Sequence, residues 1–277
     1  MPILDIYEKS LKKALNGGTA GASAMVFQVS SLMWIRTTMN YQYAEGGTFR
    51  NTLKLLYKQG GISRFYRGYS AAILQGPISR FGDTATNAGI MELTKDSNLP
   101  IAVRTGLASL SAGVFRILIM PIDAFKTTLQ VRGNDGIGIM KGKIKTNGIR
   151  TLWNGSLASA SATMIGHYPW FMTYNYLNSY IDKQDTLLGN LSRQAGIGFT
   201  ASIVSDTCSN SLRVIKTSRQ TYKTNITYSA VVKNILKQDG IRGLFFRGLD
   251  TRIIANGING MMFSVLWKFF MDKYNEK

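Results

Sequence analysis

The sequence predicts an all-α membrane protein made of three tandem repeats, each with a transmembrane helix, a short surface helix and a second transmembrane helix. Two observations support this prediction: a ten-residue segment recurs every 90 residues, and a second signature ending in glycine follows each copy. A fixed period of this kind indicates a repeated structural unit. The repeats are expected at residues 1–97, 98–185 and 186–277 of the 277-residue chain.

The first helix of each repeat carries the ten-residue segment, which begins at Ser31, Pro121 and Ser211. Small residues precede it in the same register, as at Ala112 and Ser202. Small side chains let helix backbones approach closely inside a bilayer, where packing must hold the helices together. A soluble helical repeat is the alternative, but such repeats are usually shorter and have a periodic leucine-rich core. We therefore expect these helices to span a membrane.

The second signature places an aromatic residue, a basic residue and a glycine before the second helix of each repeat. Its three copies end in Tyr66-Arg67-Gly68, Trp153-Asn154-Gly155 and Phe246-Arg247-Gly248. Short amphipathic helices are expected before each copy, near residues 49–59, 137–147 and 227–238. Longer helices are expected after each copy, near residues 69–93, 156–181 and 249–272.

The composition narrows the classes of partner and activity. The 33 Lys and Arg residues against 15 Asp and Glu give a net charge of +18, which favours nucleic acid, anionic lipid or an anionic metabolite as partner. Nucleic acid is not expected, because no basic helix, zinc framework or aromatic strand platform is present. One cysteine, Cys208, and one histidine, His167, leave no disulfide and no metal cluster. An enzyme is not expected either, since no pair of nucleophile and base stands out.

Together the two signatures resemble those of the mitochondrial carrier family, whose repeats carry Pro-x-[Asp/Glu]-x-x-[Lys/Arg] followed by [Asp/Glu]-Gly-x-x-x-x-[aromatic]-[Lys/Arg]-Gly. The resemblance covers almost the whole chain in three copies. It implies a bundle of six tilted helices with pseudo-threefold symmetry around a central cavity, in the mitochondrial inner membrane. Both termini would face the intermembrane space, and the three surface helices would face the matrix. The N-terminal segment lacks a secretory signal or transit peptide, so an organellar address is expected to be internal.

In similar carriers the second signature binds cardiolipin, so this lipid is the expected bound partner. A helix N-terminus offers free N–H groups and the positive end of its dipole to a phosphate. Asn154 replaces the basic residue in the second copy, so that lipid site should be the weakest. The alternative for all three copies is that the glycine only caps a helix at a turn and binds no lipid. The expected lipid-binding residues are Tyr66, Arg67, Gly68, Trp153, Gly155, Phe246, Arg247 and Gly248.

The chain departs from the family in the charge network that closes the matrix side. The three acidic positions of the first signature hold Met33, Asp123 and Arg213, so one carboxylate remains. The three basic positions are kept, and we expect four cations to converge on that carboxylate with net repulsion. The expected matrix network is Arg36, Asp123, Lys126, Arg213 and Lys216.

The opposite side has lost its acid–base pattern altogether. The matching residues are Asn87-Ala88 with Met91, Tyr174-Asn175 with Asn178, and Trp267-Lys268 with Met271. Proline at the kink of the first helix persists only as Pro121. Serine bends a helix more weakly than proline, so the other two hinges are expected to be stiffer.

A substrate site is expected in the cavity. Arg116 and Asp206 lie five residues before a signature Pro or Ser, a position that faces the cavity in similar carriers, and charges at mid-membrane depth are usually functional. One reading is a site for a small anion or zwitterion, in which arginines meet a carboxylate and an aspartate meets an amine. The other is that Arg116 and Asp206 neutralise each other in a vestigial cavity. The candidate cavity residues are Arg116, Asp206, Gln75, Ser79, Arg80, Asp83, Asn256 and Asn259.

Other residues near this cavity limit the chemical class of the substrate. Ala162, Thr163 and Ala255 stand where similar carriers contact their substrates, and such small or neutral side chains disfavour a nucleotide or a di- or tricarboxylate. His167 is expected to pack against Trp170 or Tyr174 rather than to act as a ligand or proton relay.

Two functions therefore remain open. The first is a carrier that moves a small anionic or zwitterionic metabolite by alternating access. The second is a carrier-like structural subunit without transport activity, in a larger inner-membrane complex such as a respiratory-chain enzyme or supercomplex. The loss of both charge networks favours the second, and the preserved repeats favour the first.

Overall fold

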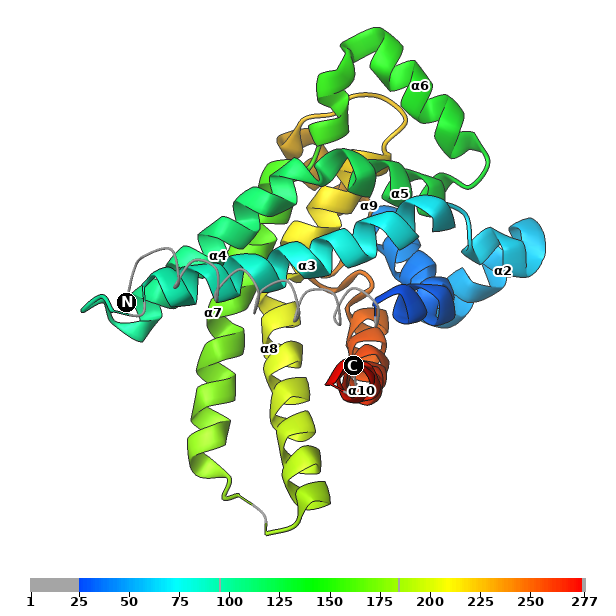
Figure 1. The fold of residues 1–277 in the computed structure, drawn as a ribbon. Coiled ribbons are helices and arrows are strands. Elements are labelled where there is room, and N and C mark those ends of the chain that lie inside the picture. Colours follow the sequence, from blue (N-terminus) through cyan, green and yellow to red (C-terminus); the bar gives the residue numbers. More distant parts are fainter. Residues whose placement is uncertain (1–24, 95, 184, 276–277) are drawn as a thin grey trace.

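The computed structural model describes residues 25–94, 96–183 and 185–275, which form helices joined by short loops and contain no strand (Figure 1). This confirms the all-α prediction. Residues 25–45 are helical, and nine α-helices and one short 3-10 helix follow among the described residues. Their bounds are α2 Phe49–Phe65, α3 Tyr69–Leu93, α4 Ile101–Leu118, α5 Met120–Arg132, α6 Asp135–Asn147, the 3-10 helix η1 Ile149–Trp153, α7 Ser156–Tyr180, α8 Leu187–Thr221, α9 Tyr228–Phe246 and α10 Leu249–Asn275.

A capping hydroxyl and glycines with positive φ set the ends and turns of the surface helices α2, α6 and α9. The Thr227 hydroxyl caps α9 by accepting a hydrogen bond from the Ala230 N–H. Glycines of the second signature interrupt the helical path, with φ of 60° at Gly61 and 64° at Gly240. Glycine adopts this left-handed conformation without a Cβ clash, so each surface helix turns there toward the next long helix.

The first helix of each repeat differs at its signature residue. In the second repeat the helix breaks at Ile119, and Pro121 starts α5 at an angle of 65° to α4. In the first and third repeats, which carry Ser31 and Ser211, the helix continues through the signature. By length and composition no single described helix qualifies as a membrane span, whereas Val103–Leu118 and Met120–Arg132 qualify as a bent pair.

The long helices pack side by side, and the helix at residues 25–45 contacts α3 and α10. The helices α7 and α8 form an antiparallel pair, with α4 against α7 and α10 beside α8 (Figure 1). Met33 of the first helix is fully buried in a cluster with Val29 and Ala72 of α3. On another face, Ile35 packs against Ala255 of α10. The first helix thus contacts both the first and the third repeats.

The C-termini of the first helices of the three repeats meet at one end of the bundle. We call this the surface-helix end, because α2, α6 and α9 lie there. Asn40 donates to Gln130 Oε1 at 2.6 Å, and Ser218 donates to the Tyr43 carbonyl at 3.0 Å. These bonds join the helix at residues 25–45 to α5 and to α8, so all three repeats are in contact at this end.

Candidate functional site

A single carboxylate joins two lysines near the surface-helix end. Asp123 of α5 is 6% exposed; its Oδ1 accepts from Lys126 Nζ at 2.9 Å, and its Oδ2 lies 2.6 Å from Lys216 Nζ on α8. Lys126 also donates to Gln75 Oε1 on α3 at 2.8 Å. A hydrogen bond to an ionised group is stronger than one between neutral groups. Side chains from all three repeats are therefore tied together at Asp123.

The expectation that four cations converge on Asp123 is wrong. Arg36 Nη2 donates instead to Asn259 Oδ1 on α10 at 3.0 Å, and Arg213 Nε donates to Ser209 Oγ at 3.3 Å. Met33, which replaces the first acid, is part of the apolar core. Neutral acceptors on α8 and α10 thus draw two of the cations away, and this spreads the repulsion over a larger volume.

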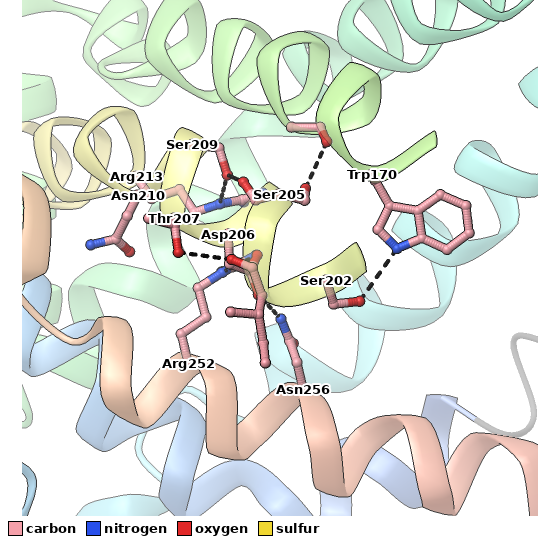
Figure 2. Close-up of polar contacts among 12 residues, drawn as sticks. Trp170, Ser202, Ser205, Asp206, Thr207, Ser209, Asn210, Arg213, Arg252 and Asn256 are labelled. Atoms are coloured by element: carbon pink, nitrogen blue, oxygen red, sulfur yellow. Dashed lines mark hydrogen bonds and ion pairs between the residues drawn. The ribbon is translucent and has the colours of Figure 1, made fainter. Parts of the chain in front are cut away.

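A second buried ion pair joins α8 to α10 (Figure 2). Asp206, 4% exposed, accepts from Arg252 Nε at 2.6 Å through Oδ1 and from Asn256 Nδ2 through Oδ2. In Figure 2 both side chains rise from α10 toward α8. The reading in which Arg116 and Asp206 neutralise each other is therefore wrong, because Asp206 takes its cation from its own repeat.

A third ion pair joins α3 to α4. Arg116 Nη2 lies 2.5 Å from Asp83 Oδ2, and the exposed Arg80 is close enough to act on both electrostatically. Asp83 Oδ1 and Arg116 Nε are shielded from solvent and have no hydrogen-bond partner in the described part of the chain. Buried polar atoms are usually hydrogen-bonded, so this pair has one acceptor and one donor left for a further group.

His167 lies near this third pair but does not pack as expected. Its Nδ1 is 2.8 Å from Ser109 Oγ on α4, and its ring meets Phe171 edge-on with centroids 6.3 Å apart. Trp170 and Tyr174 instead stack on each other at 5.0 Å. The histidine is therefore a hydrogen-bonded link between α4 and α7.

Comparison with known proteins agrees with this three-repeat arrangement. A sequence profile for the mitochondrial carrier protein matches the chain three times, over residues 7–98, 97–185 and 189–277. The chain belongs to the mitochondrial carrier family. Members of this family are mitochondrial membrane proteins, and several relatives of this chain are named as carriers or transporters.

Three relatives illustrate the range of the similarity. The mitochondrial substrate carrier family protein S of Dictyostelium discoideum is 27% identical over 93% of this chain and 96% of its own length. The calcium-dependent mitochondrial ATP-magnesium/phosphate carrier protein 2 of Arabidopsis thaliana is 25% identical over 91% of this chain and 55% of its own. The mitochondrial nicotinamide adenine dinucleotide transporter 2 of the same plant is 26% identical over 52% of this chain and 44% of its own length. The carrier thus matches about half the length of each plant relative.

Several residues predicted for the cavity of this carrier serve packing. Ala162 and Ala255 are 1% and 3% exposed and lie in helix contacts. Ser79 is also buried, and Gln75 belongs to the Asp123 cluster. Small side chains at these positions therefore allow helices to approach.

Sequence reasoning misses Arg252, which is the cation of the second pair. Arg252 lies four residues before Asn256, and residues at this spacing share one face of a helix. Because Asn256 is predicted to face the cavity, this spacing could have indicated that Arg252 faces it too. Ser109, the partner of His167, has no comparable signal, because the contact depends on how α4 packs against α7.

The predicted lipid signatures differ from one another in the structure. Arg67 is exposed, whereas Arg247 is 5% exposed, lies 2.7 Å from Asp239 Oδ2 and donates to the Ala44 carbonyl at 3.2 Å. The expectation that Arg247 is free for a lipid phosphate is therefore wrong. Asn154 is likewise buried and donates to Asn225 Oδ1 at 2.8 Å.

The signature glycines allow close contact between repeats. A Cβ at Gly155 would lie 3.0 Å from the Lys216 carbonyl oxygen, and φ there is 89°. At Gly68 a Cβ would lie 3.1 Å from the Lys126 carbonyl oxygen, with φ of 80°. Both glycines precede the first residue of a long helix, so the start of α3 and that of α7 each rest on the first helix of the next repeat.

At the opposite end of the bundle, two polar contacts between α7 and α8 involve residues of the lost acid–base pattern. Asn178 Oδ1 accepts from Arg193 Nη1 at 2.9 Å, and the Tyr174 hydroxyl donates to Gln194 Oε1 at 2.6 Å. These contacts, one of which involves the cation Arg193, link α7 of the second repeat to α8 of the third. The side chains of Asn87, Ala88, Trp267, Lys268 and Met271 lie outside the described residues.

Proposed function

We propose that this carrier moves a small anionic or zwitterionic metabolite across the mitochondrial inner membrane by alternating access. The observation that carries the proposal is an imbalance of charge between the helices. Unpaired charge at membrane depth is costly, so an anion that enters and neutralises it is bound favourably. Around the three interior ion pairs of the described residues lie six cations, Arg36, Arg116, Lys126, Arg213, Lys216 and Arg252, and three carboxylates, Asp83, Asp123 and Asp206.

The Asp83–Arg116 pair supports a zwitterion within this class. Its two unpaired atoms are an acceptor, Asp83 Oδ1, and a donor, Arg116 Nε. An ammonium group complements the first and a carboxylate the second. Both atoms are shielded while the ion pair is intact, so the ligand must first displace it.

Two buried alanines limit the size of the substrate. The plant relatives are named as carriers of ATP-magnesium, phosphate and nicotinamide adenine dinucleotide. Ala162 and Ala255 are closed off in helix contacts and offer no group to a base or phosphate. We therefore propose a substrate smaller than a nucleotide.

Alternating access needs contacts that hold one side closed. The cluster at Asp123 joins α3, α5 and α8, which belong to three different repeats. We propose that it closes the matrix side, and that substrate binding offsets the free energy of opening it.

Exchange of labelled metabolites by the purified carrier in liposomes tests this proposal. The panel holds amino acids and small monocarboxylates, with ATP-magnesium, phosphate and nicotinamide adenine dinucleotide for comparison. We expect exchange of a small anion or zwitterion, lost in Arg116→Ala and Asp83→Ala and kept in Arg150→Ala, which removes an exposed arginine. Exchange of the nucleotides alone, or equal loss in all three variants, contradicts the proposal.

The same preparation tests the structural-subunit alternative, which rests on the single remaining network carboxylate. Absence of any exchange, together with comigration with a large complex on native gels after mild extraction, favours that alternative. A monomeric species that exchanges metabolites excludes it as the main role.

We also propose that cardiolipin binds at the first lipid signature. Arg67 is exposed at the start of α3, where the Tyr69 N–H is bonded to the Tyr66 carbonyl, so the guanidinium of Arg67 is the group offered to a phosphate. Native mass spectrometry should show retained cardiolipin that Arg67→Ala reduces. Arg247→Ala, which changes a side chain turned to Asp239, should retain as much cardiolipin as the wild type, and equal retention in Arg67→Ala and Arg247→Ala would contradict the role of Arg67.

A further inference from the structure

Each first-helix C-terminus at the surface-helix end receives a buried cation from the preceding repeat. Arg64, after the break in α2, donates through Nη1 to the Gln130 carbonyl and through Nη2 to the Val131 carbonyl, both at 2.8 Å. These carbonyls belong to the last residues of α5. The first repeat thereby caps the second.

The other two junctions repeat this arrangement. Lys143 of α6 donates through Nζ to the Gln220 carbonyl at the end of α8 at 2.9 Å, which joins the second repeat to the third. Arg247, after α9, donates to the Ala44 carbonyl at the end of the first helix, which joins the third repeat to the first. We call Arg64, Lys143 and Arg247 the cation clasps; they are 6%, 4% and 5% exposed.

The chemistry of a helix end explains why cations lie there. The last carbonyls of a helix have no partner within it, and the dipole places partial negative charge on them. A buried guanidinium or ammonium needs acceptors, and a helix end supplies several. Arg132 adds a further link, with Nε donating to the Thr221 carbonyl at 2.8 Å and Nη2 2.9 Å from Glu45 Oε1.

The order of the clasps matters more than their number. They run from the first repeat to the second, from the second to the third and from the third to the first, and so form a closed ring. If this end opens because the repeats move apart, all three must break. The single carboxylate at Asp123 leaves the interior with few other contacts of this kind.

We propose that the ring of cation clasps holds the surface-helix end of this carrier closed, in place of the acid–base pairs that the sequence has lost. This inference rests on the proposed transport function for its purpose, but the closed state itself can be measured without a substrate. The clasps are positioning residues: they act on helix ends and do not touch the substrate site.

Thiol labelling measures the closed state directly. In a Cys208→Ser background, Ser79→Cys places a reporter at a buried position of α3. A membrane-impermeant maleimide is applied to the surface-helix side of the carrier in liposomes. We expect Arg247→Met to raise the labelling rate about tenfold, the change expected from losing one hydrogen bond to a charged group. Arg64→Met loses two bonds to the next repeat and should raise the rate at least as much.

The chain contains a matched control for these variants. Arg219 donates to the Ile226 carbonyl at 3.0 Å at the same end, but both residues belong to the third repeat. Arg219→Met should therefore leave the labelling rate unchanged. Arg64→Lys, which keeps the charge, should restore part of the slow rate if Arg64→Met is fast.

The outcomes separate this inference from the proposed function. Fast labelling in the clasp variants and slow labelling in Arg219→Met supports the ring even if no substrate is found. Equal labelling in wild type, Arg64→Met and Arg247→Met overturns the ring, whatever the exchange assay shows. If Arg64→Met does not fold, Arg247→Met carries the test, and an unchanged labelling rate in Arg247→Met also overturns the ring.

Discussion

Replacing Asp123 by asparagine removes the carboxylate that Lys126 and Lys216 share. The change keeps the shape of the side chain, but two lysines then face each other without a counter-charge at a position that is 6% exposed. Removing one partner of a buried ion pair typically costs about 3–5 kcal/mol, because the remaining charge is buried and unpaired. For a chain of this size that lowers Tm by roughly 6–15 °C.

The assay is thermal unfolding of the purified carrier in mild detergent, with two companion variants. Asp135→Asn removes an exposed carboxylate from α6 and should change Tm little. In Asp123→Asn/Lys216→Gln one of the stranded charges is also removed, so the double variant should be more stable than Asp123→Asn alone. If Asp123→Asn matches wild type, or if the two changes simply add, the carboxylate does not hold α5 and α8 together as argued.

Three further predictions concern other parts of the chain. Burial beside Arg132 and Arg219 lowers the pKa of Lys143 to about 8 from 10.5, so its protonated form is disfavoured in the folded state. The burial of the charged lysine therefore lowers the free energy of unfolding, by an amount on the order of 3 kcal/mol at most. This loss is full below about pH 8 and disappears as the pH rises toward 10.5. Unfolding curves should show stability rising across this pH range in the wild type but not in Lys143→Met. Gly155→Ala should lower Tm more than Gly148→Ala, because both have positive φ but only at Gly155 would the new Cβ meet a carbonyl oxygen; equal shifts would refute the contact. Arg252→Gln strands Asp206 and should destabilise the carrier by about 3 kcal/mol or more, and Asp206→Asn in the same background should recover part of that loss, as double-variant unfolding can measure.

The architecture could be predicted because it repeats. The recurrence of Ser31, Pro121 and Ser211 places the first helices, and the signature glycines place the starts of the second helices. The bend at Pro121, absent at the two serines, also follows from the chemistry of a single residue.

The contacts of the charged side chains could not be predicted in the same way. The cation clasps at positions 64, 143 and 247 are not separated by the 90-residue period, so each repeat caps its neighbour with a different residue. Arg36 lies outside the predicted cluster because its acceptor, Asn259, is 223 positions away on α10. A side chain takes the nearest acceptor in the folded state, and repeat register does not specify that acceptor.

Ligand-dependent thermal stabilisation of the wild-type carrier and of Arg116→Met tests most directly the claim that interior charges bind the substrate. We predict that a small anion or zwitterion raises the Tm of the wild type and has no effect on Arg116→Met, while ATP-magnesium and nicotinamide adenine dinucleotide shift neither. Equal stabilisation of both proteins by the same small ligand, or stabilisation of the wild type by the nucleotides alone, would contradict this account.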